Sequence, residues 1–280
     1  MSTIERAIES ILNQSYQNFE ILIIDDASTD QTIDVLKKYS NNSRIRIFNL
    51  SNNGGVNIAR NTGLRNVSND SDFITFLDSD DEFTIDALLN MKRTIESNLS
   101  INYFRFPVKY IDGTSVSDTS LFNTIADYKQ YISHIHTCGE WVVTFNKKVL
   151  LDGFLYDERV KAFESLSWLN LVMKENVYYD DFVVRVYHLD VEGISRPSKK
   201  GIQYYENLKN GFSLILENHG EALIKYNREF FVSYLYELAN ICAILGDRKG
   251  GVNKLSRAMK YDFFNIGILR FFKNSIIKRF

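Results

Sequence analysis

Over residues 1–97, segments with the pattern of β-strands alternate with segments with the pattern of amphipathic helices, and this alternation constrains the fold most strongly. The strand patterns are short and rich in β-branched or aromatic side chains, at 20–24, 44–48 and 73–77. The helix patterns repeat apolar residues three and four positions apart, at 3–14, 28–39, 52–66 and 84–97. This order predicts an α/β fold with a mainly parallel sheet and right-handed crossover connections.

Two local signals refine this half of the chain. Ser28-Thr29-Asp30-Gln31 has the spacing of a capping box, which predicts a helix that begins there with Ile33 and Leu36 facing inward. Asn52-Asn53-Gly54-Gly55 predicts a turn that opens the next helix. We expect its glycines to serve the geometry of the turn, with phosphate binding as the less favoured interpretation.

After residue 97 the pattern changes. It predicts strands at 103–110, 141–145 and 182–187, helices at 124–133 and 163–174, and a mostly helical region over 199–280. Pro107 favours an edge position for its strand, because proline cannot donate a hydrogen bond to a neighbouring strand. Asp112-Gly113 predicts a hairpin turn. We therefore expect a domain over 1–198 followed by a helical extension over 199–280.

Carboxylates cluster directly after two of the predicted strands. Asp25 and Asp26 follow the first, and Asp78, Asp80 and Asp81 follow the third. If both strands belong to one parallel sheet, their carboxyl ends meet at the edge where α/β sheets bind ligands. Crowded carboxylates repel one another unless a cation offsets their charge, which favours a Mg²⁺-like ion completed by phosphate oxygens. An acidic turn or helix N-terminus is the alternative explanation.

Composition and charge exclude several classes of protein. The 280 residues are 45% hydrophobic, which is globular, and the net charge of −2 offers no basic face for nucleic acid. Cys138 and Cys242 lie too far apart for a disulfide framework or a zinc site. Without a transmembrane-length apolar stretch or a signal peptide, a cytoplasmic protein is expected. Residues 267–280 could lie on an anionic membrane surface or pack as an ordinary terminal helix.

The order of the motifs resembles a family 2 glycosyltransferase of the GT-A fold. The resemblance extends from about residue 4 to residue 197. Each motif is weak by itself, but their order and spacing together are specific. The matching segments are 7–16, 19–30, 53–63, 76–81, 141–158 and 187–195.

This resemblance implies the transfer of a sugar from a nucleotide diphosphate, usually linked to UDP, to a saccharide or lipid-linked saccharide, as in bacterial polysaccharide biosynthesis. A Mn²⁺ or Mg²⁺ ion would offset the charge that builds on the leaving diphosphate, and direct attack by the acceptor would invert the sugar. By this resemblance, Asp26 and Asp25 would contact the nucleotide base, Asp78 would lie near the ribose, and Asp80 would bind the metal ion. Arg60 and Asn61 would open onto the same nucleotide pocket.

Two departures from the family bear on activity. The family begins with a strand and a loop that contacts the nucleotide, but Met1 falls just before the first predicted helix. Either the start site is misassigned or the chain is a shortened relative with an unpaired sheet edge. The family's general base is usually the Asp of a Glu-Asp pair, and here Glu164-Ser165 occupies that place. Serine is a poor base, so Glu164 is the substitute, although a first-turn carboxylate favoured by the helix dipole is the preferred interpretation.

Other residues and other functions carry less weight. Asp157 and Glu158 are more distant candidates for the base, the four histidines show no metal spacing, and Trp141 fits core packing better than sugar stacking. The first alternative function is an inactive relative that binds a nucleotide or a partner protein. A receiver-like signalling domain is a second, but no Lys-Pro pair occurs and some 80 helical residues would be unexplained.

Overall fold

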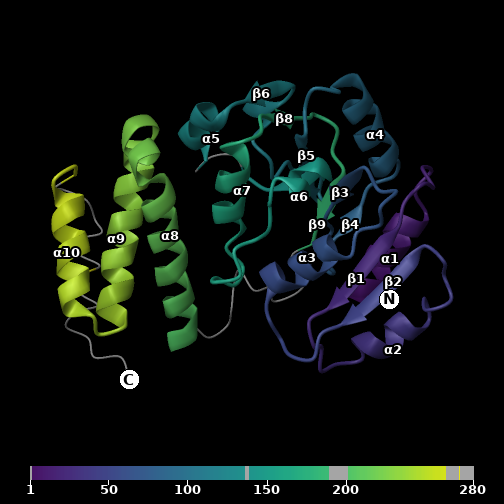
Figure 1. Cartoon of the computed structure of the whole chain (residues 1–280), viewed down its shortest axis with the longest axis horizontal. Coiled ribbons are helices and arrows are strands. Elements are labelled where there is room, and N and C mark those ends of the chain that lie inside the picture. The colour runs from purple at the N-terminus through teal and green to yellow at the C-terminus, as the bar shows by residue number, and fades with distance from the viewer. Residues whose placement is uncertain (1, 136–138, 189–200, 263–270, 272–280) are drawn as a thin grey trace.

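A computed structural model describes residues 2–135, 139–188, 201–262 and 271 (Figure 1). The helices are α1 (Thr3–Leu12), α2 (Thr32–Lys37), α3 (Val56–Arg65), α4 (Ala87–Ser97), the 3-10 helix η1 (Thr119–Leu121), α5 (Tyr128–His134), α6 (Lys148–Leu151), α7 (Glu164–Val172), α8 (Ile202–Tyr226), α9 (Arg228–Ile244) and α10 (Arg248–Met259). The strands are β1 (Ile21–Asp25), β2 (Ile45–Asn49), β3 (Phe73–Thr75), β4 (Glu82–Phe83), β5 (Tyr103–Tyr110), β6 (Thr124–Ala126), β7 (Trp141–Asn146), β8 (Val177–Tyr179) and β9 (Arg185–Tyr187).

The first two strands form a small parallel sheet of their own. β1 pairs with β2 so that Ile21 lies opposite Ile45. Apolar residues of this sheet pack with Ile8 of α1 and Leu36 of α2, which the sequence pattern also turns inward. The predicted order of helices and strands is confirmed for this part of the chain. Each of the two helices packs its apolar side against the sheet.

The predicted capping box at 28–31 is wrong. The main-chain N–H of Ser28 donates to the Asp25 carboxylate at 3.2 Å, which folds the chain into a turn after β1. The helix therefore begins only at Thr32, without a side-chain cap. One consequence is that Ile33 is exposed rather than inward.

The remaining strands form a larger mixed sheet in the order β3-β7-β5-β8-β6, with β9 joining β5 to β4. β5 runs parallel to β8 and β9 and antiparallel to β7. Its side chains from Tyr103 to Val108 are almost completely buried, which places this strand at the centre of the core. The α/β fold class with a helical C-terminal region is confirmed (Figure 1). The expected mainly parallel sheet is wrong, because β1 and β3 belong to separate sheets and β3, β4, β6 and β7 pair in antiparallel fashion.

The edge position expected from Pro107 is wrong, because β5 has neighbours on both sides. On one side the neighbour changes from β8, which ends opposite Arg105, to β9, which begins opposite Val108. Pro107 lies at this change and accepts a hydrogen bond from the N–H of Val184 through its carbonyl. A proline is tolerated here because it has no partner residue in β8 or β9, so no strand hydrogen bond from its nitrogen is required on that side.

The single helix expected over 124–133 is replaced by β6 and α5. Asp127 and Gln130 form a capping box, in which each side chain accepts the main-chain N–H of the other residue, at 2.8 and 2.9 Å. This box fixes the start of α5. The three residues before it are free to pair with β8.

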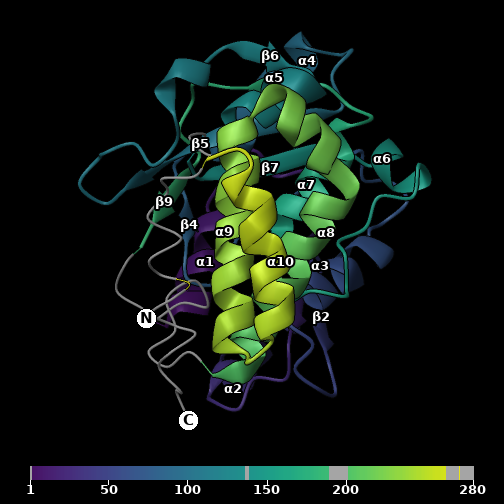
Figure 2. The same cartoon turned by 90° about the vertical axis from the view of Figure 1, so that its left-hand side faces the viewer.

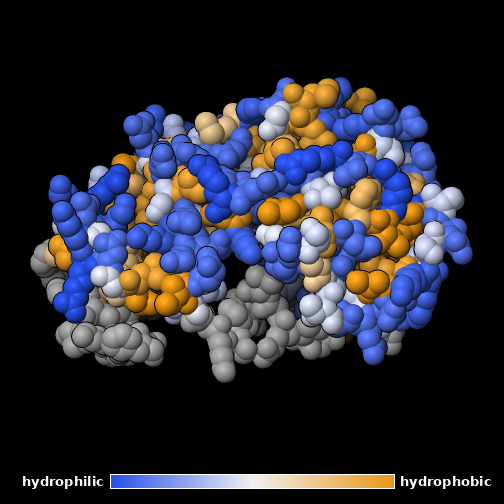
Figure 3. Space-filling model, turned by 60° about the horizontal axis from the view of Figure 1, so that its bottom comes forward, coloured by the Kyte–Doolittle hydropathy of each residue, from blue (hydrophilic) through white to orange (hydrophobic). Residues whose placement is uncertain are grey.

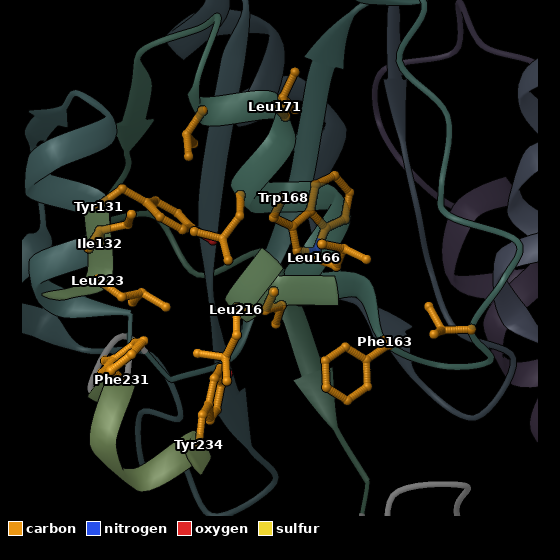
Figure 4. Packing of buried hydrophobic residues seen from close by; sticks show 14 of the residues in the cluster. Tyr131, Ile132, Phe163, Leu166, Trp168, Leu171, Leu216, Leu223, Phe231 and Tyr234 are labelled. Atoms are coloured by element: carbon orange, nitrogen blue, oxygen red, sulfur yellow. The ribbon is translucent and has the colours of Figure 1, made fainter. Parts of the chain in front are cut away.

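The C-terminal helices α8, α9 and α10 stand side by side and pack onto the α/β part, as Figures 1 and 2 show. Tyr131 of α5, Leu166 of α7, Leu223 of α8 and Phe231 of α9 belong to one apolar cluster (Figure 4). The predicted helical character of 199–280 is confirmed for the helices between 202 and 259. The segment 267–280, singled out for membrane contact, lies outside the described residues except for Phe271.

A large gap separates the two sheets. Within the described residues, no strand pairs with the second edge of β1 or with the outer edge of β3. A cavity of about 1720 Å³ lies between them, lined by β1, β3 and one side each of α1, α3 and α4. The unpaired sheet edge expected from the sequence is thus present. In Figure 3, apolar side chains reach the surface on the side where β1 and β2 lie in Figure 1.

Candidate functional site

The loop after β3 carries the three clustered carboxylates. The main-chain N–H of Asp81 donates to the carbonyl of Asp78 at 3.1 Å, which closes the loop as a turn. Asp78 and Asp80 line the cavity, whereas the side chain of Asp81 is only 1% exposed and points away from it into the protein. We call residues 78–81 the acidic loop.

Three arginines from separate elements surround the acidic loop. Arg60 of α3 contacts the Asp78 carboxylate at 3.0 Å. Arg185 of β9 lies 3.3 Å from the Asp81 carboxylate and 3.7 Å from that of Asp78. Arg6 of α1 donates to the main-chain oxygen of Asp80. The loop is therefore held through its backbone and through two of its three carboxylates.

These contacts set the ionisation of the loop. Burial opposes the ionisation of Asp78, but the charges of Arg60 and Arg185 outweigh it and lower the pKa of this carboxyl. Burial raises the pKa of Asp81 to about 7. The charge of Arg185 lowers this pKa and the charge of Asp78 raises it further. The two paired carboxylates of one short loop thus have opposite pKa shifts.

Arg60 connects the acidic loop to the start of α7. Its guanidinium contacts Glu164 at 2.8 Å, and the same group lies 5.4 Å from the ring centres of Phe76 and Tyr156. Its charged neighbours, Asp78 and Glu164, raise its pKa despite burial, so the group stays cationic. Glu164 lines the cavity beside it, while Ser165 follows in the first turn of α7 and is not among the residues that line the cavity.

Asp26 organises the turn before α3. Its two carboxylate oxygens accept the main-chain N–H groups of Gly54 and Gly55, each at 2.7 Å. Gly55 has φ of 86°, and a Cβ atom there would lie 3.1 Å from the side chain of Lys161. The glycines therefore serve the geometry of the turn, as the sequence indicates. Asp25 is 5% exposed and does not line the cavity.

Asn61 holds a neighbouring loop and does not line the cavity. Its side chain is 1% exposed, donates to the Tyr156 carbonyl at 2.9 Å and accepts the Tyr156 N–H at 2.8 Å. Asn57, which no sequence signal singled out, donates to the carbonyls of Asp157 and Val160 in the same loop. These two amides fix the loop that leads to Glu164.

The other candidate residues have structural partners. Asp157 pairs with Arg159, and Glu158 accepts from Asn61 and Arg65, so the more distant candidates for a base are both engaged. Trp141 is buried in the core, with its ring centre 4.9 Å from that of Tyr179. The preference for core packing at this position is confirmed.

Among the described residues, the acidic loop offers one carboxylate to a metal ion. In the part of the chain that the structure describes, no three His, Cys, Asp or Glu side chains gather into a metal site. Asp80 differs from its neighbours in the loop, since its carboxylate forms no ion pair with a described residue and lines the cavity. One such carboxylate fits an ion that takes its remaining ligands from phosphates and water.

Residues 2–152 match the family model described as "Glycosyl transferase family 2". The minor teichoic acid biosynthesis protein GgaA of Bacillus subtilis is 33% identical over 187 residues, which cover 61% of this chain and 41% of GgaA. The GalNAc(5)-diNAcBac-PP-undecaprenol beta-1,3-glucosyltransferase of Campylobacter jejuni is 30% identical over 190 residues, 66% of this chain and 60% of that protein. The chain thus spans less than half of GgaA.

Solved structures share the fold. Residues 1–349 of S. aureus TarS, in complex with UDP-GlcNAc, superpose with a TM-score of 0.64 at 18% identity, over 97% of this chain and 85% of that one. The mannosyltransferase PcManGT from Pyrobaculum calidifontis, in complex with GDP-Man and Mn²⁺, superposes with a TM-score of 0.55 at 14% identity. The match covers 98% of this chain and 80% of PcManGT. No helix among the described residues has the length and apolarity needed to span a membrane.

Proposed function

This chain belongs to glycosyl transferase family 2, and on that premise we propose that it transfers a sugar from a nucleotide diphosphate to a saccharide or lipid-linked saccharide. The observation that carries the proposal is the convergence of Asp26, Asp78, Asp80, Arg60 and Glu164 on one cavity. These residues come from four separate parts of the chain. A shared cavity lined by charged groups is what a polar, charged donor requires.

The donor is proposed to be linked to UDP. TarS, which shares the fold, is described in complex with UDP-GlcNAc. In this assignment Asp26 and Asp25 form the part of the pocket near the base, with Asp26 acting at the cavity wall and Asp25 behind it. Asp78 lies near the ribose, where Arg60 orients its carboxylate. Asn61 supports the pocket through the loop that it holds.

Asp80 would hold a Mn²⁺ or Mg²⁺ ion against the donor diphosphate. Such an ion, when bound, offsets the negative charge on the leaving diphosphate. The chain's own contribution is to leave one carboxylate of the acidic loop available while two arginines neutralise the others. Arg6 donates to the main-chain oxygen of Asp80 and so helps to fix the backbone of this residue at the cavity wall.

Glu164 is the proposed general base for the acceptor hydroxyl, with Ser165 in the place where the family usually has Asp. Its carboxylate lines the cavity, and the ion pair with Arg60 fixes its position. A base must reach the proton that it removes, so its fixed orientation matters as much as its basicity. Direct attack by the acceptor on the sugar would make the transfer inverting.

The acceptor class rests on the relatives. GgaA is named for teichoic acid biosynthesis, and the Campylobacter jejuni relative for transfer to an undecaprenol-linked saccharide. A lipid-linked acceptor would bring the protein to a membrane surface. We assign the transfer to residues 1–198 and treat 199–280 as a helical extension, of which α8 lines part of the cavity through Tyr204 and Asn207.

A second candidate function has one observation in its favour. Among the described residues, no strand pairs with β1 or β3 on the sides that face each other, and the cavity beside Asp26 is wide. A chain with such a gap could bind a nucleotide without transferring the sugar. Binding and turnover must therefore be measured separately.

The test is calorimetric titration of UDP into the folded chain with Mn²⁺, then with EDTA, with GDP as the control nucleotide. We expect UDP to bind with Mn²⁺ and to lose at least about tenfold in affinity, or 1.4 kcal/mol, with EDTA. Turnover of UDP-sugars by the same sample then separates a transferase from a binding protein. A folded chain that binds neither UDP nor GDP contradicts the proposal.

A further inference from the structure

We infer that Arg185 is a positioning residue for the acidic loop, and this inference rests on the proposed function of that loop. Arg185 holds Asp81 and Asp78 in place from behind, so that Asp80 stays directed at the cavity. No sequence motif singles out this arginine, which lies more than 100 positions after the loop. We infer this positioning role from the contacts of Arg185, its burial and its place in the sheet.

The contacts of Arg185 are concentrated on carboxylates. Its Nε atom lies 3.3 Å from Asp81 Oδ2, its Nη1 atom 3.7 Å from Asp78 Oδ2, and its Nη2 atom 3.8 Å from Glu140 Oε2. Each nitrogen of the guanidinium thus faces a different acid. A planar group with several donors can do this, whereas a lysine ammonium acts as a single point charge.

Burial makes the Arg185 and Asp81 charges depend on each other, although their nearest atoms, Nε and Oδ2, form no hydrogen bond. The side chains of Arg185 and Asp81 are 7% and 1% exposed. A charge buried without a partner costs several kcal/mol, so removing one member of such a pair is far more disruptive than breaking a surface pair. Within the described residues, Arg185 is the one cation in contact with the Asp81 carboxylate.

The backbone of Arg185 is fixed on both sides. Arg185 lies opposite Phe83 of β4 in one direction and opposite Val108 of β5 in the other. β4 begins directly after the acidic loop, so the strand that carries Arg185 is the neighbour of the chain leaving that loop. The guanidinium therefore has a defined position relative to Asp81.

Arg185 is placed to orient and not to touch the donor. It is not among the residues that line the cavity, whereas Asp78 and Asp80 are. With Asp78 and Asp81 neutralised, Asp80 keeps the one carboxylate of the loop that has no cation among the described residues. Loss of Arg185 would leave the buried Asp81 carboxyl without its cation, so that it must take up a proton or move to water. Either change removes the attraction that holds the loop against β9.

The experiment compares Arg185→Gln and Arg185→Lys with wild type by hydrogen exchange of the peptide that contains residues 78–81. The control is Lys209→Gln, which breaks the ion pair with Asp247 at 2.9 Å in the helical part. We expect exchange at the loop to rise by about tenfold or more in Arg185→Gln, with a smaller rise in Arg185→Lys and none in the control. UDP affinity with Mn²⁺ should fall by about tenfold in Arg185→Gln alone.

A double variant, Arg185→Gln with Asp81→Asn, keeps the inference testable if Arg185→Gln folds poorly. Removing the unpaired carboxylate should restore folding and most of the protection of the loop. Unchanged exchange in Arg185→Gln, or exchange in the double variant as fast as in the single one, overturns the inference. Since exchange does not depend on a nucleotide, a wild-type chain that binds neither UDP nor GDP refutes the proposed function and leaves exchange to decide the role of Arg185.

Discussion

Arg60 and Glu164 lie 104 positions apart in the chain, and their side chains meet at 2.8 Å beside the cavity. The same guanidinium contacts Asp78, so one arginine joins the acidic loop to the start of α7. A donor bound at the loop and an acceptor activated at α7 would therefore be held at a fixed distance. This link is the basis of the first two predictions.

Replacing Arg60 by Lys should preserve the charge but lose the fork that reaches both carboxylates. We expect sugar transfer to fall by about 100-fold, because a small displacement of reacting groups is costly. Arg65→Lys is the matched control, since Arg65 lies on the same helix and pairs with Glu158 near the surface. Initial rates with a UDP-sugar measure both variants. Equal rates for wild type and Arg60→Lys would show that the fork is not needed.

The base is tested by Glu164→Gln and Ser165→Asp. Glutamine keeps the shape of Glu164 but cannot accept a proton, so transfer should fall by about 100-fold or more while UDP affinity changes little. Ser165→Asp supplies a carboxylate at the next position and should raise transfer. If Glu164→Gln retains full activity, Glu164 only pairs with Arg60. If Ser165→Asp lowers transfer, the correspondence with the family's Asp is wrong.

Asp80→Ala should abolish the dependence of UDP binding on Mn²⁺. The reason is that Asp78 and Asp81 are paired with arginines, so no other carboxylate of the loop is available to an ion. Calorimetry with Mn²⁺ and with EDTA should give the same weak affinity in this variant. Asp34→Ala, at an exposed position on α2, is the control and should behave as wild type. Unchanged, metal-dependent affinity in Asp80→Ala would remove the metal assignment.

Gly55→Ala and Gly113→Ala form a matched pair. Both glycines have positive φ, 86° and 90°, so both substitutions carry a backbone cost of about 1 kcal/mol. Only at Gly55 does the added Cβ meet a neighbour, Lys161, and only there does the N–H bind Asp26. We expect Gly55→Ala to lose more stability and to weaken UDP binding. Equal free energies of unfolding from urea denaturation would contradict this.

Acid should destabilise the protein partly through His219. Burial lowers the pKa of His219 to about 4, and its ring accepts the Tyr128 hydroxyl at Nδ1 and donates to Asn170 from Nε2. The unfolded chain takes up this proton near pH 6.5 and the folded chain only near 4, so stability falls as pH decreases between these values. The free energy of unfolding falls by about 3 kcal/mol over this pH range.

The variant His219→Gln isolates this effect, because its amide keeps a donor and an acceptor but does not titrate in this range. Urea denaturation at pH 7 and at pH 5 should show a smaller loss of stability in the variant than in wild type. The other acid-sensitive groups are common to both proteins and cancel in the comparison. Equal losses in the two proteins would mean that His219 takes up its proton over the same pH range in the folded and the unfolded chain.

The sequence predicts the elements of this fold best where the pattern is local and strong. The alternation over 1–97 and the position of the carboxylates after β1 and β3 follow from short apolar segments and are confirmed. The start of α2 was mispredicted because Asp25 captures the N–H of Ser28, a contact made by the tertiary turn. Pro107 was mispredicted because its neighbour changes from β8 to β9, which only the assembled sheet reveals.

The candidate site is predictable in part for the same reason. Asp78 and Asp80 stand in a recognisable motif, and their placement at the cavity agrees with it. The contacts of Arg60 with Glu164 and of Arg185 with Asp81 join residues more than 100 positions apart, and no spacing in the sequence indicates such pairs. Asn61 also stands in a motif, but packing turns its side chain away from the cavity.

The gap between β1 and β3 has a consequence for cooperativity. The described residues form no ladder of hydrogen bonds between the two sheets. Polar contacts such as Glu20 with Ser71 and Arg6 with Asp80 therefore help to tie the β1–β2 unit to the larger sheet. Such a unit opens at a lower free energy than the rest. A nucleotide that touched Asp26 on one side and the acidic loop on the other would join the two units. The cooperativity of their unfolding would then increase with ligand concentration.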